Sequence, residues 1–481
     1  MADINTLTAA GLSQVSAKLY GQKKSDNVPA YVEIIGDVTY TVGATGCDFT
    51  DLDAAFDYID SALVYSGAAI NITVKDGTYA HTAPLRATSY NFLPVYVSAE
   101  HVYTKTVSSI QGSSGSAGAW AIELNLNSVS DIAVNDWVLI NATTGGTKPT
   151  FLAGAHKITA VDAINSRITI ESKHKNAAAP SGAVSATATI IKVVLSFTGC
   201  DGIQVFNNVT MGSLQNIMVV GDLTSGKIGL SVQDGSRLFI GGKVGVSGFD
   251  YNVFALYGAE INGDGTIISS NARNFAFNAT DSGIISLAAG AVSSGSGQIG
   301  VYAYRGGQIY MPGLITTGCS QQGILSSARG TVSCGATGGT STGNLRGVET
   351  LTMGYVNPSE ITVSDNTNAD LRSTVLDKLD ITAPTGITQV IQSFFVGASS
   401  SYITQNGSYF QFVNNSGILD VDGKTGVRFK INGTVNMNIN STGIGFNGAT
   451  PIARPVLPTG AGKTVDEVIT VLQNYGLVSQ S

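Results

Sequence analysis

Residues 252–275, NVFALYGAEINGDGTIISSNARNF, form one unit of a repeat that runs from residue 205 to 356 and decides the fold. The next unit, residues 276–299, is AFNATDSGIISLAAGAVSSGSGQI. Units begin at Val205, Gly229, Asn252, Ala276, Gly300, Gly323 and Gly347, which are 24, 23, 24, 24, 23 and 24 residues apart. This period indicates a solenoid, in which each coil buries its apolar side by stacking on the next.

Three columns of the repeat are regular. One residue after each start is apolar: Phe206, Leu230, Val253, Phe277, Val301, Ile324 and Val348. Nine residues after each start is apolar too: Leu214, Leu238, Ile261, Ile285, Ile309, Val332 and Val356. Seven residues after lies a small residue, which we expect to permit a tight corner, often with positive φ: Gly212, Ser236, Ala259, Gly283, Gly307, Gly330 and Gly354. The pattern predicts a right-handed parallel β-helix with 23–24-residue coils.

Other repeat architectures fit less well. The period is too short for a propeller blade, and ankyrin or tetratricopeptide units need helical periodicity. A leucine-rich repeat needs a Leu-x-x-Leu-x-Leu pattern, which the units lack.

The composition suits a β-rich body and excludes several functions. The 481 residues include 58 Gly, only 12% are charged, and the net charge is −7. Without a basic stripe, nucleic-acid binding is not expected. No apolar run is long enough to span a membrane. The start, Met1 to Ile4, lacks the basic flank and apolar core of a signal peptide, so we expect synthesis in a host cytoplasm. The four cysteines and four histidines are scattered, so neither a metal site, nor a disulfide framework, nor a cofactor is expected.

Changes in composition and hydrophobic pattern divide the chain into six segments. We expect an attachment segment (1–40), a capping helix with the first coils (41–104), an inserted small β-barrel (105–190), the main β-helix (191–383), a β tip intertwined between chains (384–450) and a Pro-rich segment with a terminal helix (451–481). The cap has Asp51 before Leu52, Phe56, Ile59 and Leu63 at helical spacing, and Ser108 to Gly118 is expected to be a linker. The tip has turn signals at 422–423, 432–433 and 447–448, and Thr464 with Glu467 predicts a capping box.

Three stretches resemble bacteriophage tail spikes and tail fibres of the pectin-lyase-like β-helix type. They are GATGCDFTDLDAAFDYI (43–59) with ITVKDGTY (72–79), the coil array, and GFNGATPIARP (445–455) before a short helix. The resemblance implies a homotrimer whose amino end docks on other tail or baseplate proteins of the virion. It also implies host adsorption through surface polysaccharide, which many family members degrade as hydrolases or lyases.

The resemblance supplies no catalytic motif, so candidates come from an outward column. Five residues after each start stand Thr210, Asp234, Tyr257, Asp281, Arg305, Ala328 and Thr352. Asp234 and Asp281 are two coils apart, or roughly 9–10 Å. This is at the upper edge of the ~6.5–9.5 Å used by inverting glycosidases. Arg305 lies one coil beyond Asp281, and its positive charge favours the ionised Asp281 carboxylate, which suits Asp281 to the role of general base. Asp234 is then the candidate general acid.

The alternative is that these charges are solvated turn residues of a corner. Glu260, Asp264, Glu349 and Glu360 lie on or beside the array and are further acid candidates, and a groove between chains is another place for catalysis.

Outward aromatic residues are the candidates for glycan binding. Strand parity turns Phe254, Tyr302 and Tyr304 outward and places Tyr257 near a turn. Aromatic faces stack on sugar rings, but they also suit the interface of a trimer.

Three functions remain open at this point. The first is a virion appendage that binds and degrades surface polysaccharide. The second is a binding-only or purely structural fibre, and the third is a secreted lyase-like enzyme. The missing signal peptide argues against the third.

Overall fold

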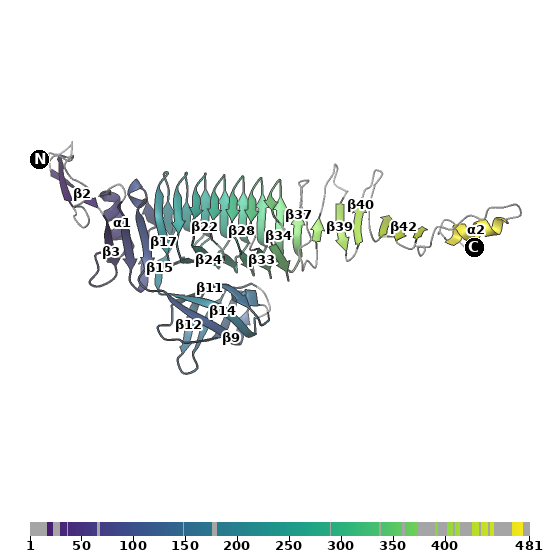
Figure 1. The fold of residues 1–481 in the computed structure, drawn as a ribbon, viewed down its shortest axis with the longest axis horizontal. Coiled ribbons are helices and arrows are strands. Elements are labelled where there is room, and N and C mark those ends of the chain that lie inside the picture. Colours follow the sequence, from purple (N-terminus) through teal and green to yellow (C-terminus); the bar gives the residue numbers. More distant parts are fainter. Residues whose placement is uncertain are drawn as a thin grey trace. The chain divides into compact units, whose positions relative to one another are not determined.

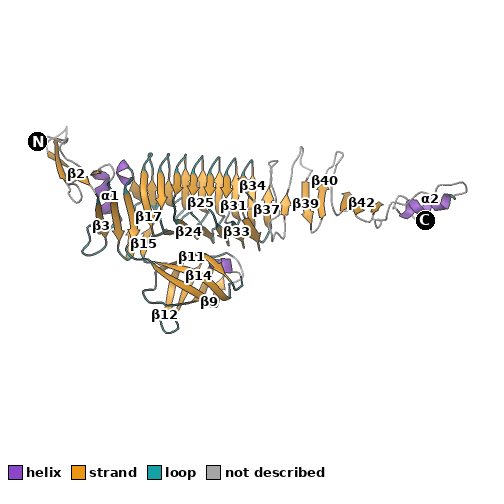
Figure 2. Cartoon of the chain, in the orientation of Figure 1, coloured by secondary structure: helices purple, strands orange, loops and turns teal. Residues whose placement is uncertain are grey.

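The structure is a computed structural model in which strands dominate the chain (Figures 1 and 2). It describes residues 17–22, 29–35, 37–64, 68–147, 149–175, 180–288, 290–335, 338–357, 361–373, 390–392, 402–406, 409–413, 426–431, 434–440, 443–446 and 464–474. These residues fall into two units divided near residue 370.

The first unit contains a parallel β-helix of three sheets, which confirms the predicted fold class (Figure 1). Sheet 1 contains β6 (Gly77–His81), β15 (Val193–Phe197), β18 (Met218–Val220), β21 (Lys243–Ser247), β24 (Thr266–Ser270), β27 (Val292–Ser294), β30 (Ile315–Thr317), β33 (Gly339–Thr342) and β36 (Ile361–Ser364). Sheet 2 contains β7 (Leu85–Ala87), β16 (Ile203–Val205), β19 (Ile228–Val232), β22 (Tyr251–Leu256), β25 (Phe275–Thr280), β28 (Ile299–Tyr304), β31 (Gln322–Ser327) and β34 (Arg346–Leu351). Sheet 3 contains β3 (Val38–Val42), β5 (Ile70–Val74), β8 (Val95–Ala99), β17 (Thr210–Gln215), β20 (Arg237–Ile240), β23 (Glu260–Asn262), β26 (Ile284–Ser286), β29 (Gln308–Tyr310), β32 (Thr331–Ser333) and β35 (Tyr355–Val356).

The predicted apolar columns form the core from Gly229 onward. In sheet 2, Leu230, Val253, Phe277, Val301, Ile324 and Val348 lie in register and are buried. In sheet 3, Leu238, Ile261, Ile285, Ile309, Val332 and Val356 do the same. Each strand alternates inward and outward residues, so every coil adds one apolar layer.

The first coil is misaligned in the sequence-based prediction. Ile203, not Phe206, pairs with Leu230, and Met211, not Leu214, pairs with Leu238. Likewise Thr210 pairs with Arg237, so it is a strand residue and not a corner residue. Gly212 lies within β17, so it does not occupy the small corner position either. The reason is a longer connection: residues 221–227 join β18 to β19, whereas residues 248–250 join β21 to β22.

The corner between sheets 2 and 3 differs in one respect from the prediction. Two successive residues with positive φ make each bend, as at Asp234 (54°) with Gly235 (69°) and Tyr257 (55°) with Gly258 (70°). The predicted small residue follows this bend and does not carry the positive φ. A Cβ at Gly283 or Gly307 would lie 2.2 or 2.1 Å from a carbonyl oxygen of the preceding coil. Small residues stand there because two backbones approach closely.

A helix covers the coils nearest the amino end, as predicted (Figure 2). Helix α1 (Leu52–Ser61) begins after Asp51, whose carboxylate accepts a hydrogen bond from the Ala54 amide at 2.8 Å. Leu63 lies in β4 (Leu63–Val64) and not on the helix. Strand β4 joins β1 (Ala17–Gln22) and β2 (Pro29–Ile35) in a three-stranded sheet, and the 3₁₀ helix η3 (Tyr90–Phe92) precedes β8.

A closed barrel is inserted between β8 and β15. Its strands are β9 (Tyr103–Ser116), β10 (Ala119–Leu126), β11 (Trp137–Thr144), β12 (Gly154–Asp162), β13 (Arg167–Ser172) and β14 (Gly182–Ile191), with the 3₁₀ helix η4 (Pro149–Leu152) between β11 and β12. The expected linker at Ser108 to Gly118 is wrong, because most of it belongs to β9 and pairs with β10. Trp120 is buried in the barrel core.

The barrel packs on the outer face of sheet 1. The outward column Val194, Met218, Ile268 and Val292 forms one buried cluster with Leu139, Ala153, Ala155 and Ile191 of the barrel. We call this cluster the barrel seam. Polar contacts flank the seam: the Ala155 amide donates to Ser270 Oγ at 2.7 Å, and His174 Nε2 lies 3.0 Å from Thr317 Oγ1.

The second unit contains short strands and one helix. Strand β37 (Ala369–Ser373) pairs in parallel with β38 (Val390–Gln392), while β39 (Tyr402–Asn406) and β40 (Tyr409–Val413) are antiparallel. Strands β41 (Gly426–Ile431), β42 (Thr434–Asn440) and β43 (Gly443–Phe446) form an antiparallel sheet. The amide of Thr464 donates to Glu467 Oε2 at 3.1 Å at the start of α2 (Val465–Asn474), which confirms the capping box. The turns expected at 422–423, 432–433 and 447–448, and residue Glu360, lie outside the described residues.

Candidate functional site

The predicted corner column exists as one continuous row. Asp234, Tyr257, Asp281 and Arg305 each occupy the first position of a bend, with φ between 47° and 55°. Backbone hydrogen bonds tie successive bends together: Gly235 N donates to the Tyr257 carbonyl at 3.0 Å, and Gly258 N donates to the Asp281 carbonyl at 3.2 Å. Because the bends are in register, the row places these four side chains one above another along sheets 2 and 3.

Two of the predicted residues in this row, Asp281 and Arg305, contact each other. Arg305 Nη1 lies 3.9 Å from Asp281 Oδ1, and the Arg305 guanidinium stands 4.9 Å above the Tyr304 ring. The guanidinium side chain is 62% exposed, so solvent screens the ion pair and its contribution to stability is small. Asp234 makes no side-chain contact with these residues within the described part of the chain.

A row of aromatic rings covers the middle of sheet 2. Tyr302 stacks on Tyr304 at 5.5 Å, and Phe254 stacks on Tyr251 at 5.7 Å. Phe275 joins the two pairs, at 5.4 Å from Tyr251 and 5.2 Å from Tyr302. All five rings are half-buried. Strand parity turns Phe254, Tyr302 and Tyr304 outward, and their ring contacts place Tyr251 and Phe275 beside them. We call Tyr251, Phe254, Phe275, Tyr302 and Tyr304 the aromatic row. Burial raises the pKa of Tyr302, so its hydroxyl stays protonated and donates or accepts near neutral pH.

Tyr251 and Phe275 were missed by the sequence-based prediction. They stand one residue before the starts of two units, at Asn252 and Ala276. This column also pairs residue by residue, since Tyr251 faces Phe275 and Phe275 faces Ile299. The period of the repeat was therefore enough to align them, but strand parity with the buried Val253 and Phe277 would have turned them inward. Tyr257 lies apart from the row, at the corner, and is 58% exposed.

A polar pocket of about 290 Å³ opens on the strands of sheet 2 that precede the aromatic row. Arg86, Gln204 and Ser231 line it from successive strands of sheet 2, and Gln233 and Asp234 line it from the corner. Ser231 lies in register with Phe254, so the pocket and the aromatic row share one outward column. We call it the polar pocket. Asp281 does not line it, so the two candidate carboxylates do not share one pocket.

A second pocket, of about 560 Å³, lies on the outer face of sheet 3. Its lining includes two aromatic residues, three glycines, a glutamine and an acid: Tyr96, Phe239, Gly212, Gly241, Gly263, Gln215 and Asp264. Asp264, an alternative acid in the prediction, lies in the turn between β23 and β24 and does not line the polar pocket. Glu260 pairs with Arg237 at 3.1 Å and Glu349 pairs with Arg346 at 3.0 Å, so each faces a cation of its own.

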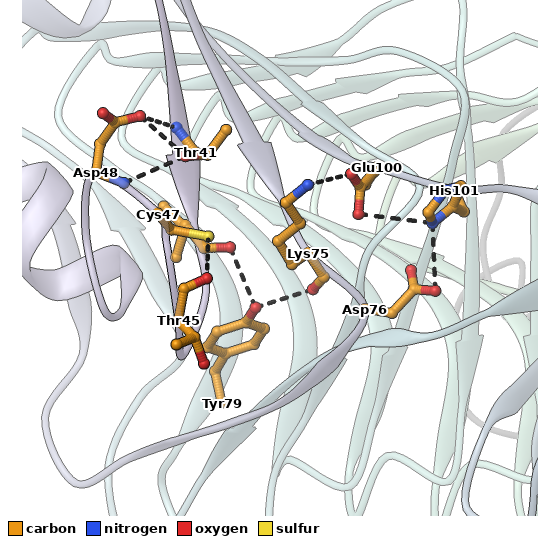
Figure 3. A network of polar contacts seen from close by, with 10 residues as sticks. Thr41, Thr45, Cys47, Asp48, Lys75, Asp76, Tyr79, Glu100 and His101 are labelled. Atoms are coloured by element: carbon orange, nitrogen blue, oxygen red, sulfur yellow. Dashed lines mark hydrogen bonds and ion pairs between the residues drawn. The ribbon is translucent and has the colours of Figure 1, made fainter.

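A cluster of titratable side chains lies near the chain's entry into the barrel (Figure 3). His101 Nδ1 is 3.3 Å from Asp76 Oδ2 and 3.7 Å from Glu100 Oε2, and Glu100 also pairs with Lys75. This ion pair raises the pKa of Lys75. The Tyr79 hydroxyl donates to the Lys75 carbonyl at 2.9 Å. These groups satisfy one another and fix the ends of neighbouring strands, and no set of ligands suited to a metal ion occurs among the described residues.

Comparisons with known proteins give a structural likeness to a phage protein. No family model and no curated protein matches the chain. Among solved structures, the tailspike protein gp49 from Pseudomonas phage LKA1 is 14% identical, over 71% of this chain and 67% of that chain, with a TM-score of 0.20. The fold assignment therefore rests on the strand pairing described above. No helix in the described part of the chain is long and apolar enough to cross a membrane.

Proposed function

We propose that this protein is a virion appendage of a bacteriophage, a tail spike or tail fibre, that binds host surface polysaccharide. The observation that carries the proposal is the outward column of sheet 2, in which the polar pocket continues into the aromatic row. Flat rings offer apolar faces to the C–H faces of sugars, and the pocket adds hydrogen-bonding groups at one end. A polymer thus meets a track of alternating apolar and polar contacts.

The β-helix suits such a track because it is rigid. Successive strands of sheet 2 are hydrogen-bonded in parallel, so the rings stand at the spacing of the strands, about 4.8 Å per coil. A surface that is already ordered loses little conformational entropy when a ligand binds. Low charge, at 12% of residues, leaves hydroxyl, amide and aromatic groups as the main contacts, which suits a polyhydroxylated ligand.

A second candidate function is cleavage of the bound polymer. Asp234 lines the polar pocket, and Asp281 stands two bends further along the same row, about 9–10 Å away by the spacing of the coils. This distance is at the upper edge of the range for an inverting acid–base pair. In this scheme Asp234 protonates the leaving oxygen, and Asp281, paired with Arg305, activates water.

The test is to incubate the purified protein with host surface polysaccharide, measure binding and size the products. We expect binding, and we expect the double variant Phe254→Ala/Tyr302→Ala to weaken it about tenfold or more. Tyr310→Ala is the matched control, because Tyr310 is 47% exposed on sheet 3. Undiminished binding by the double variant would move the site elsewhere, and a protein that does not bind polysaccharide from its host would contradict adsorption through this polymer.

Shortening of the polymer decides between the two functions. If products shrink, Asp234→Asn and Asp281→Asn test the acid–base pair, and each substitution is expected to remove cleavage while binding persists. Cleavage that survives both substitutions excludes this pair. Polymer that is bound but remains intact supports the binding-only fibre.

We also propose that three chains assemble, with residues 1–40 docking on the virion, as the resemblance implies. A trimer would bury the edges of the short strands in the β tip. Light scattering is expected to give a mass near three times 49.5 kDa. A mass of 49.5 kDa at micromolar concentration would contradict the trimer.

A further inference from the structure

Arg86 brings a positive charge to the polar pocket. Arg86 Nε donates to Gln204 Oε1 at 3.1 Å, which is a neutral partner. By contrast, Arg237, Arg305 and Arg346 each pair with a carboxylate, at 3.1, 3.9 and 3.0 Å. No carboxylate forms an ion pair with Arg86 among the residues that the structure describes. Arg86 therefore presents an uncompensated positive charge to the pocket.

Asp234 lines the same pocket and also lacks a cation partner within the described part of the chain. It does not pair with Arg86, so more than 4 Å separates the carboxylate from the guanidinium. Its place at the first position of the bend, with φ of 54°, is fixed by the backbone hydrogen bonds of the corner row. Between the two charges lie Gln204, Ser231 and Gln233, and Gln233 Nε2 donates to Ser231 Oγ at 2.7 Å.

The two charged groups suit different parts of one sugar ring. A guanidinium presents planar donors that match a carboxylate in a bidentate fashion. A carboxylate without a cation accepts hydrogen bonds from ring hydroxyls, which a neutral or acidic sugar supplies on several carbons. An anion placed between the two groups would be repelled by Asp234, but an anion on the far side, against Arg86, is attracted.

We propose that the polar pocket binds an acidic sugar unit of the polysaccharide, with the sugar carboxylate on Arg86 and neighbouring hydroxyls on Asp234 and Gln233. Arg86 is then the residue that determines specificity, while the aromatic row binds charged and neutral units alike. The inference rests on the proposed function and names the class of sugar that the same site selects.

The test uses polygalacturonate, alginate and hyaluronate, each before and after chemical reduction of its carboxylates to alcohols. We expect at least one acidic polymer to bind about ten- to a hundredfold more tightly than its reduced form. Added NaCl should weaken binding of the acidic form more than that of the reduced form, because salt screens the interaction with Arg86. Arg86→Gln should abolish the preference, so that the variant binds the acidic and the reduced polymer equally.

Two control variants separate this inference from the proposed function. Arg237→Gln removes an exposed arginine of sheet 3 that already has a carboxylate partner, so it should keep the preference. Phe254→Ala should weaken both forms of a polymer by the same factor. Equal binding of acidic and reduced polymers, a preference that survives Arg86→Gln, or no binding of any acidic polymer would overturn the acidic-sugar proposal. The proposed function is judged separately, by binding of host polysaccharide.

Discussion

Sheets 1 and 2 are built by the same coils, yet their outer faces differ completely. The outward column of sheet 1 is aliphatic (Met218, Ile268 and Val292) and lies buried under the barrel. The outward column of sheet 2 contains Phe254 and Tyr302, which remain partly exposed. Aliphatic groups stabilise the folded state only through the apolar surface that they bury, whereas aromatic rings also offer stacking faces and polar edges. The comparison teaches that an aliphatic outer column suits a docked domain, whereas an aromatic one also suits the sugar ligand that we propose.

The largest effect is expected from a charge placed in the barrel seam. Ile268→Asp puts a carboxylate at a fully buried position without a partner, and we expect the free energy of unfolding to fall by about 3–5 kcal/mol. Phe254→Asp, the same change on sheet 2, should cost about 1–2 kcal/mol, because the position is half-exposed and loses mainly its stacking on Tyr251 and its strand propensity. Thermal unfolding measures both. An equally large loss at Phe254 would show that another chain covers sheet 2, which would break the comparison.

A smaller effect is expected from overfilling the barrel seam. Gly245 lies opposite Leu139, and an added Cβ would come within 2.9 Å of Leu139 Cδ2 and 2.3 Å of Met218 Sδ. Gly245→Ala should therefore lower the free energy of unfolding by about 1–3 kcal/mol, as is usual for overpacking. Chemical denaturation checks this value. A neutral result would mean that the barrel shifts freely on sheet 1.

Acid should weaken the barrel through His156. Burial lowers the pKa of His156, despite opposing hydrogen bonds to the Leu152 and Glu171 backbone. In the unfolded chain His156 takes up a proton near pH 6.5, whereas in the folded barrel it does so only at lower pH. The contribution of neutral His156 to the free energy of unfolding is therefore complete above pH 6.5 and decreases below it. The loss is at most about 1.4 kcal/mol per pH unit. Melting temperatures at pH 7.5, 6.0 and 5.0 measure it, and His156→Gln should show a weaker pH dependence than the natural protein.

The smallest effect concerns the strained corner row. Tyr257 holds φ at 55°, a conformation that costs a non-glycine residue roughly 1–2 kcal/mol. Tyr257→Gly removes this strain but adds freedom to the unfolded chain, so we expect a net gain of about 0.5–1 kcal/mol. Leu256→Gly, in the adjoining strand, should instead destabilise the protein by a similar amount. A loss of stability with Tyr257→Gly would show that the ring packs against another chain.

The fold was largely predictable because the repeat encodes it. From Gly229 onward, columns such as Leu230, Val253 and Phe277 kept their register, since each coil has 23 or 24 residues. The same arithmetic failed at Val205, because the longer connection at residues 221–227 displaced the first coil by several positions. A single insertion shifts every column on one side of it, and no property of Phe206 or Leu214 alone reveals the shift.

The candidate site was predictable only in part. The spacing of the coils located the corner row and most of the aromatic row, because both follow the period. The polar pocket was not predictable, since Arg86 lies 118 residues before Gln204 and the barrel insertion separates them in sequence. The barrel seam was missed for a related reason. An outward Ile268 beside an inward Ile267 does not reveal which of the two faces the core of the β-helix.

The central claim is that polysaccharide binds along the outer face of sheet 2. Hydroxyl-radical footprinting with mass spectrometry tests it most directly, because it reports the exposure of individual aromatic side chains. The account predicts that bound host polysaccharide lowers the oxidation of Phe254, Tyr302 and Tyr304 and leaves Tyr310, on sheet 3, unchanged. Protection of Tyr310 and Phe239 instead, with unchanged oxidation of Tyr302, would contradict the account and place the polymer on sheet 3.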